Sequence, residues 1–186
     1  MEKELYRHIR DCLARRQRLV LATVVARSGS GPREAGASMA VKEDGDSMGT
    51  IGGGLLEAQV LAVAQEVLHR AHPVRLTFSL TAKEVASGGM LCGGRVEVLV
   101  DILEGKDPRS LRLFAKIVAA QEEGRRVWLI RSIRTEKPER GVMTHGSNTI
   151  PDSHRRPDAR GDCRQYRGGA YCLPGEKMKI KMSRTR

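Results

Sequence analysis

Aromatic side chains are scarce in this chain of 186 residues. One Trp, three Tyr and two Phe make up 3% of the sequence, so a hydrophobic core has to be built mainly from aliphatic side chains and methionine. Hydrophobic residues together reach 40%, which is enough for one ordinary domain. The shortage of aromatic rings also leaves few surfaces on which nucleic-acid bases could stack.

Long apolar runs are also absent. No stretch of about 18 residues is apolar throughout, which excludes a membrane-spanning helix. The N-terminal sequence MEKELYRHIRDCLARRQ is charged throughout and contains no apolar signal region. Four cysteines are too few for a disulfide scaffold. We therefore expect a cytoplasmic protein that does not contact a membrane.

Basic residues outnumber acidic ones, and the net charge is +11. Residues 1–134 contain 21 Lys and Arg against 16 Asp and Glu, a net charge of +5, while residues 135–186 contain 12 against 6, a net charge of +6. The latter segment has no Phe or Trp and few aliphatic residues. Such a segment cannot bury enough apolar surface to offset the entropy of ordering it. The sequence predicts a domain at 1–134 and a disordered or loosely attached basic tail at 135–186.

Helix and strand patterns alternate along residues 1–134. The run LVLATVV at 19–25 is apolar and rich in β-branched residues, which is typical of a strand buried on both faces. Asp107 and Pro108 form a start signal for a helix. The predicted fold class is α/β, or α+β, with a mixed β-sheet and flanking helices. We expect helices at 3–16, 55–70 and 109–122, strands at 19–25, 74–80, 96–103 and 126–131, and a hairpin formed by 37–42 and 47–51.

Two glycine-bearing segments have the features of anion-binding loops. Ser28-Gly29-Ser30-Gly31-Pro32-Arg33 follows the buried strand, and Arg33 adds a fork of donors for a phosphate or carboxylate. Gly52-Gly53-Gly54 begins a helix, where unpaired N–H groups and the helix dipole favour an anion. The second segment is not a dinucleotide fingerprint, because Glu57 stands where the third glycine is required.

A third segment places the thiol of Cys92 between two glycine pairs. A cationic or N–H-rich neighbourhood, to which Arg95 could contribute, would raise its thiolate fraction. Each segment also has a purely structural interpretation, since glycine-rich loops and inert cysteines are common. All three lie at strand ends, so we expect them to converge on one edge of the sheet, where such folds bind ligands.

The segments ATVVARSGSGPREAGASMAV, GTIGGGLLE and MLCGGRVEVLV occur in this order and together resemble the N-terminal domain of the XdhC/CoxI family. The resemblance covers about Leu19–Leu103 and extends more weakly to about Ile133. Members are accessory proteins of molybdenum hydroxylases such as xanthine dehydrogenase and carbon monoxide dehydrogenase. The resemblance implies a chaperone that binds the molybdenum cofactor (molybdopterin), alone or in dinucleotide form. It would protect the cofactor during sulfuration by a cysteine desulfurase and insert it into the apo-hydroxylase.

The resemblance also implies which residues hold the cofactor. Cys92 would contact molybdenum or its sulfur, and a soft thiolate suits such a centre. No catalytic residue is implied, because the expected work is binding, orientation and transfer rather than turnover. A homodimer is compatible with this role. The expected cofactor-binding residues are Ser28, Gly29, Ser30, Arg33, Gly52, Gly53, Gly54, Glu57, Cys92, Gly93 and Gly94.

Two other functions stay open on the sequence. A nucleotide-dependent enzyme acting on the cofactor would need carboxylates for Mg²⁺, and Asp44, Asp46 and Glu57 are the nearby candidates. A nucleic-acid-binding protein would use the basic tail, but Tyr166 and Tyr171 are its only aromatic residues, so we disfavour nucleic acid as a partner.

Longer family members continue with a Rossmann-like domain that opens on a glycine fingerprint. No such fingerprint follows Ile133 here. We therefore expect either a single-domain member of the family, or a truncated or frame-shifted product in which the basic tail stands in place of that domain.

Overall fold

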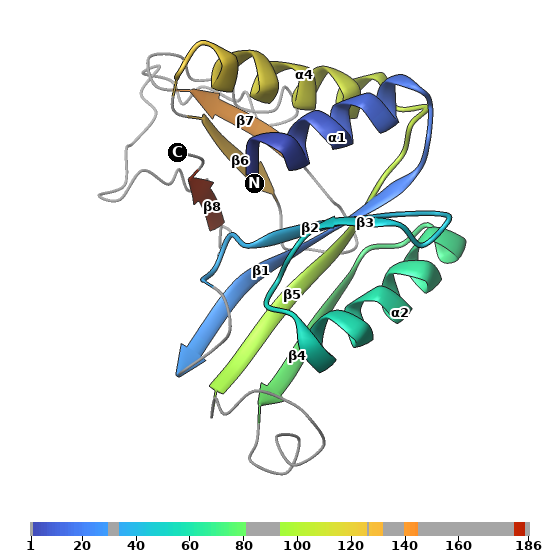
Figure 1. The fold of residues 1–186 in the computed structure, drawn as a ribbon, viewed down its shortest axis with the longest axis vertical. Coiled ribbons are helices and arrows are strands. Elements are labelled where there is room, and N and C mark those ends of the chain that lie inside the picture. The colour runs from blue at the N-terminus through green and yellow to red at the C-terminus, as the bar shows by residue number, and fades with distance from the viewer. Residues whose placement is uncertain are drawn as a thin grey trace, which may run out of the picture.

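The chain folds into helices packed on two β-sheets (Figure 1). The computed structural model describes residues 2–29, 34–80, 94–125, 127–131, 140–144 and 181–184. None of the helices in these ranges is long and apolar enough to cross a membrane. The elements are α1 (Glu2–Ala14), β1 (Leu19–Gly29), β2 (Ser38–Lys42), β3 (Ser47–Gly49), α2 (Gly54–Arg70), β4 (Val74–Leu80), β5 (Gly94–Leu103), α4 (Pro108–Glu122), β6 (Val127–Arg131), β7 (Arg140–Thr144) and β8 (Lys181–Arg184).

The larger sheet has five strands in the order β3-β2-β1-β5-β4, and the smaller one has the order β7-β6-β8. The predicted sheet with flanking helices is confirmed, in its α+β form. Every pairing between described strands is antiparallel, where the sequence predicted mixed directions. The reason is connectivity: β1, β2 and β3 are consecutive neighbours, as are β4 and β5, and each pair reverses direction without a helical crossover.

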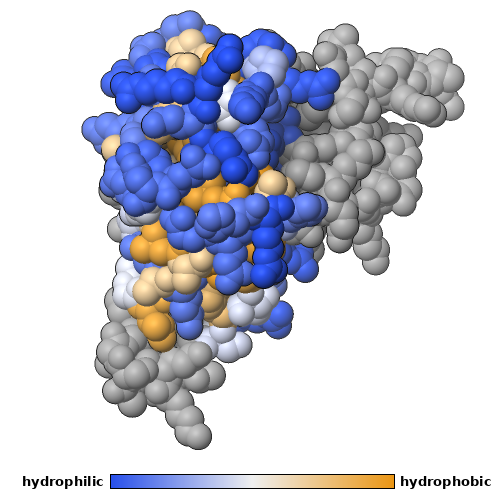
Figure 2. Space-filling view, turned by 90° about the vertical axis from the view of Figure 1, so that its right-hand side faces the viewer, coloured by the Kyte–Doolittle hydropathy of each residue, from blue (hydrophilic) through white to orange (hydrophobic). Residues whose placement is uncertain are grey.

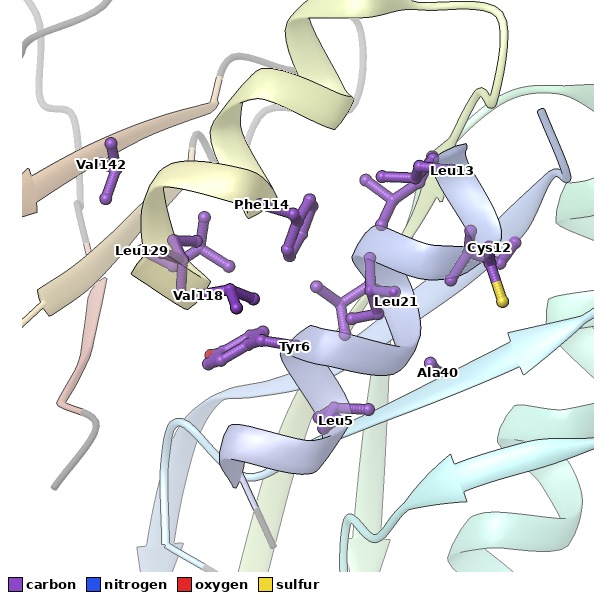
Figure 3. Close-up of a cluster of buried hydrophobic side chains, with 14 of the residues drawn as sticks. Leu5, Tyr6, Cys12, Leu13, Leu21, Ala40, Phe114, Val118, Leu129 and Val142 are labelled. Carbon is purple, nitrogen blue, oxygen red and sulfur yellow. The ribbon is translucent and has the colours of Figure 1, made fainter. Parts of the chain in front are cut away.

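Strand β1 separates two hydrophobic cores, which confirms the strand buried on both faces that LVLATVV predicts. Leu19 and Leu21 pack into a cluster with α1 and α4, where the rings of Tyr6 and Phe114 lie 6.0 Å apart (Figure 3). The opposite face of β1 packs with α2 into a second cluster, built from aliphatic side chains and Met39. The scarcity of aromatics is thus accommodated by placing two of the rings in one core. The residues that β1 contributes to the second cluster are Val20, Ala22 and Val24.

The helix boundaries follow local chemistry. Asp107 caps α4 by accepting hydrogen bonds from the N–H groups of Arg109 at 3.0 Å and Ser110 at 3.2 Å. Pro108 occupies the first turn, where its missing N–H costs nothing. At the other end of the domain α2 stops at Ala71, which adopts a left-handed conformation. The three predicted helices are confirmed to within two residues at each end.

The smaller sheet uses part of the predicted tail. Both β7 and β8 pair with β6. Arg140 of β7 donates to Asp101 of β5 through two nitrogens, Nε to Oδ2 at 2.8 Å and Nη2 to Oδ1 at 2.7 Å. The predicted boundary at 134 therefore does not separate residues 140–144 from the domain. Composition could not show this, because the strand is held by its pairing with β6, by the buried Val142 and by an ion pair with a residue far away in the sequence. Residues 145–180 lie outside the described ranges.

Gly105 allows the turn between β5 and α4 to pack against the end of α1. A Cβ atom at this position would collide with the carbonyl groups of Arg16 and Gln17. These are backbone atoms, which cannot rotate away, so we expect Gly105→Ala to lower the free energy of unfolding by about 3 kcal/mol. Urea denaturation followed by circular dichroism measures the loss. Gly124→Ala is the matched control, because Gly124 has a φ of 68° but open space around it, and should cost about 1 kcal/mol. Equal losses would contradict the steric explanation.

Candidate functional site

One candidate site lies at the end of the larger sheet where β1 stops and β5 starts. Gly29 pairs with Gly94, and Gly94 pairs on its other side with Leu80. Three strands therefore end or begin in one row, at the lower end of the sheet in Figure 1. The segment with Ser30 and Arg33 follows Gly29, and the segment with Cys92 precedes Gly94. The predicted residues Ser28, Gly29 and Gly94 are thus brought together.

The next row of the sheet presents a cation between two hydroxyl groups. Ser28 pairs with Arg95, and Arg95 pairs with Ser79. Directly opposed residues on neighbouring strands point to the same face, so these three side chains form a row. All three are exposed, and the closest carboxylate recorded for Arg95 is Glu97, at 4.0 Å. An exposed guanidinium flanked by hydroxyl groups is a suitable donor set for a phosphate or carboxylate.

A bulge in β1 decides which face Ser28 occupies. The pairing with β5 shifts between Val24 and Ala26, so Val25 is an extra residue. Val24 points into the core under α2, and in a regular strand Ser28 would point the same way. The bulge turns Ser28 to the opposite face, beside Arg95. The row therefore depends on an irregularity that the hydrophobic pattern does not reveal.

The Gly52–Gly54 turn is organised by Glu57. Its Oε1 atom accepts hydrogen bonds from the hydroxyl of Thr50 and from the N–H groups of Ile51 at 3.0 Å, Gly52 at 3.2 Å and Gly53 at 2.8 Å. Consecutive N–H groups that converge on one oxygen form an anion-binding nest. The sequence predicts that these groups are available to an external anion, whereas in the structure the protein's own carboxylate accepts from them.

Hydrogen bonding keeps Glu57 ionised. Burial raises the pKa of its carboxyl, but the hydrogen bonds from Thr50 and from the three backbone N–H groups outweigh burial, and the pKa lies below the usual value. Glu57 therefore carries a full negative charge at neutral pH. The ionised carboxylate of Glu57 therefore holds the turn in shape without a bound ligand.

The outer side of the same turn is open. Gly53 and Gly54 have φ values of 78° and 60°, and a Cβ atom at either position would meet nothing within 4 Å. Gly53 is the N-cap residue of α2, and no side chain caps the helix. The first N–H groups of a helix have no partner within it. A flat or anionic ligand could therefore approach the start of α2 from this side.

The structure separates the turn from the row at Ser28. The N–H of Thr50 donates to the carbonyl of Ser38 at 3.1 Å, and the hydroxyls of Ser38 and Thr23 lie 2.8 Å apart. Thr23 is five residues before Ser28, which corresponds to about 16 Å along a strand. Ser28, Gly29 and Gly94 form one group, and Gly52, Gly53, Gly54 and Glu57 form another. The predicted residues Ser30, Arg33, Cys92 and Gly93 lie outside the described ranges.

Ser79 and Thr50 are site residues that sequence analysis missed. Ser79 reaches the site only through the register between β4 and β5, which the sequence does not encode locally. Thr50 could have been found from its position two residues before Gly52, with an acidic residue in the first turn of the helix.

The other carboxylates considered for a metal are engaged in a turn. Asp44 and Asp46 contact the Nζ atom of Lys42 at 3.2 Å and 2.8 Å between β2 and β3. In the part of the chain that the structure describes, no three His, Cys, Asp or Glu side chains are grouped so that they could hold a metal ion.

Comparison with known proteins identifies the segment that contains the first two glycine loops. Residues 2–79 match the model of the XdhC and CoxI family. This segment belongs to the XdhC/CoxI family. The resemblance predicted from the sequence motifs is confirmed over this stretch, which ends before Cys92.

Two similar proteins are longer than this chain. The Escherichia coli (strain K12) protein YqeB is 37% identical over 96 residues, which are 51% of this chain and 17% of YqeB. A crystal structure described as that of a xanthine dehydrogenase from Bacillus halodurans has a TM-score of 0.60 and 23% identity. The match covers 78% of this chain and 46% of that one. At this identity the likeness shows a shared fold.

Proposed function

We propose that this chain is an accessory protein of molybdenum hydroxylases of the xanthine dehydrogenase or carbon monoxide dehydrogenase type. It binds the molybdenum cofactor, holds it during sulfuration by a cysteine desulfurase, and delivers it to the apo-hydroxylase in the cytoplasm. Membership of residues 2–79 in the XdhC/CoxI family supports this role. The observation that carries cofactor binding is the exposed row Ser28–Arg95–Ser79, beside the chain ends that flank Cys92.

The residues at this end of the sheet fit a phosphorylated pterin. Arg95 is exposed and its contact with Glu97 is long, so its guanidinium is available for the cofactor's phosphate. Ser28 and Ser79 supply hydroxyl groups on the same face. When bound, the cofactor supplies molybdenum and its terminal sulfur. Cys92 is proposed as the protein ligand to that centre, and Ser30, Arg33 and Gly93 as further contacts.

The second group of residues has a different proposed role. The N–H groups of Ile51, Gly52 and Gly53 are bound to Glu57, so the turn does not offer them to a phosphate. Glu57 is therefore proposed as the residue that shapes the turn. The open surface over Gly53 and Gly54 is proposed as a separate ligand contact, because the turn lies apart from the row at Ser28. Because Asp44, Asp46 and Glu57 are all engaged within the chain, we propose no Mg²⁺-dependent nucleotide chemistry.

Cofactor retention by the purified chain tests the function. We expect about one molybdopterin per chain, measured by the fluorescence of the oxidised pterin. Arg95→Ala should weaken binding about tenfold or more, because a charge-assisted hydrogen bond contributes about 1.5–3 kcal/mol. Cys92→Ala in the same assay tests the proposed ligand to molybdenum.

Arg70→Ala is the matched control for Arg95→Ala. Arg70 is an exposed arginine at the far end of α2, where it pairs loosely with Glu66 at 3.9 Å. Its replacement should leave retention unchanged. Absence of pterin from the unaltered protein would refute cofactor binding, and equal losses in the two arginine variants would refute the site at β1 and β5.

A further inference from the structure

A dense group of cations lies where α1 ends and α4 begins, far from the row at Ser28. Two follow the last residue of α1, one lies in the turn before α4, and three lie on the exposed side of α4. All six side chains are exposed. We call this group the basic face, and its members are Arg15, Arg16, Lys106, Arg109, Arg112 and Lys116.

Backbone packing makes the basic face continuous. Gly105 lies against the carbonyl groups of Arg16 and Gln17, which brings Lys106 next to the end of α1. On α4, Arg109, Arg112 and Lys116 are spaced three and four residues apart, so they share one side of the helix. Arg7 pairs with Glu122 at the end of α4, at 3.2 Å, and the buried contact of Tyr6 with Phe114 holds α1 and α4 side by side.

The basic face is not neutralised within the described residues. None of its six cations forms an ion pair with a described carboxylate. The nearby acidic residues have other partners: Asp11 pairs with Arg10, and Glu104 pairs with Arg18. Asp107 faces the start of α4 and accepts hydrogen bonds from its backbone. An acidic partner would therefore supply the negative charge that the described part of the fold does not provide.

The composition of the basic face favours a protein as partner. It has no aromatic side chain, since Tyr6 and Phe114 are buried beneath it, so it offers no ring for a base to stack on. It also lacks exposed large apolar side chains, which a membrane surface would require. The exposed large apolar side chains among described residues are Met48 and Leu55, on β3 and α2. Figure 2 views the molecule from the right-hand side of Figure 1. The upper part of this view is mostly hydrophilic, and apolar surface gathers in the lower part.

From these observations we infer that the basic face is a docking surface for an acidic protein surface. The arginines supply planar donor forks for carboxylates, and the two helices hold them in a fixed arrangement. This surface is separate from the proposed cofactor site. A partner could therefore bind here while the end of the sheet stays accessible.

Charge reversal on the full chain tests the inference. The probe is a fluorescent polyglutamate peptide of about 20 residues, whose binding is followed by anisotropy at about 50 and 200 mM salt. Arg109→Glu/Arg112→Glu/Lys116→Glu should weaken binding at least about tenfold, because the charges that attract the peptide are reversed. The control Lys3→Glu/Arg70→Glu/Arg75→Glu changes the net charge equally at scattered exposed positions and should weaken binding by no more than about twofold.

Each outcome of this experiment decides the question. Equal losses in the two triple variants would show that peptide binding follows net charge, and would overturn the inference. Tighter binding to a DNA duplex of equal charge, or to vesicles of anionic lipid, with loss in the first variant, would assign the surface to nucleic acid or membrane instead. Arg112→Glu alone, with an expected loss of about threefold, covers the case in which the triple variant does not fold. Pterin retention should be unchanged in all of these variants.

Discussion

Asp101→Asn should lower the free energy of unfolding by about 3–5 kcal/mol, which is the usual cost of removing one partner from a buried ion pair. Asp101 is 2% exposed and receives two hydrogen bonds from Arg140, at 2.8 Å and 2.7 Å. Nη1 of Arg131 lies 3.7 Å from Oδ2 of the same carboxylate. The substitution keeps the shape of the side chain but leaves the buried guanidinium of Arg131 and the partly buried one of Arg140 with no negative charge between them.

The burial of Arg131 makes the cluster of Asp101, Arg131 and Arg140 especially sensitive to the loss of the carboxylate. Arg131 is 6% exposed, and its Nη2 atom has no hydrogen-bond partner. Burial lowers the pKa of Arg131, and the nearby charge of Arg140 lowers it further, while Asp101 acts in the opposite direction. The one carboxylate therefore balances two cations. Without the Asp101 carboxylate, nothing offsets the cost of removing the two guanidinium groups from water.

Urea denaturation followed by circular dichroism measures the effect of Asp101→Asn. Asp46→Asn, on an exposed turn, is the matched control and should change stability by about 0.5 kcal/mol or less. A double-mutant cycle with Arg140→Gln should show strong coupling, because the second change removes one of the stranded cations. A loss below about 1 kcal/mol for Asp101→Asn would show that the cluster does not hold the two sheets together.

Glu57→Ala should cost about 2–3 kcal/mol, because the N–H groups of Ile51, Gly52 and Gly53 lose their shared acceptor. Ile51 itself is fully buried, so water cannot easily replace the carboxylate there. Glu57→Gln should cost less, since an amide oxygen can still accept while the charge is lost. Glu66→Gln, at an exposed position on α2, is the control and should have little effect.

The pH dependence follows from the direction of the pKa shift. Because the pKa of Glu57 is lower in the folded state than in the unfolded chain, its contribution to stability is fully present above the ordinary value of 4.5. That contribution is lost as the pH falls through the lower, folded-state pKa. The stability difference between the unaltered chain and Glu57→Gln should therefore shrink as the pH falls from 7 to about 3. A constant difference would show that ionisation of Glu57 does not hold the turn.

Cofactor retention separates the two roles considered for Glu57. If Glu57 shapes the turn, Glu57→Gln should lower stability and retention together. If Glu57 contacts the cofactor directly, retention should fall while stability is preserved. Stability and retention, both measured on Glu57→Gln, therefore test whether Glu57 shapes the turn or contacts the cofactor.

The elements of the fold could be predicted from the sequence because their causes are local. Asp107 and Pro108 specify a helix start, and LVLATVV specifies a central strand, within a few residues of chain. Long-range pairings could not be predicted in this way. Asp101 and Arg140 are 39 residues apart, and neither is unusual in its own segment. The segment around Arg140 is polar, so its composition indicated a tail, although the ion pair with Asp101 and the pairing of β7 with β6 attach it to the domain.

The residue types of the candidate site could be predicted from the sequence, but their arrangement in space could not. The glycines at 52–54 indicated a turn that accommodates an anion, which is what the structure contains. The identity of that anion depends on the first turn of α2, which places Glu57 above the turn. The row at Ser28, Arg95 and Ser79 depends on strand register and on the bulge at Val25, and both are set by the packing of the whole sheet.

The bulge also determines where β1 tolerates a change in length. Leu19 and Leu21 pack into one core and Val20, Ala22 and Val24 into the other, so the loss of a residue in this stretch would move side chains from one core to the other. Val25 belongs to neither core and has no counterpart on β5. Its deletion would leave the pairings of Val24 with Val98 and of Ser28 with Arg95 intact. Among related sequences, single-residue insertions and deletions in this strand should therefore concentrate at this position.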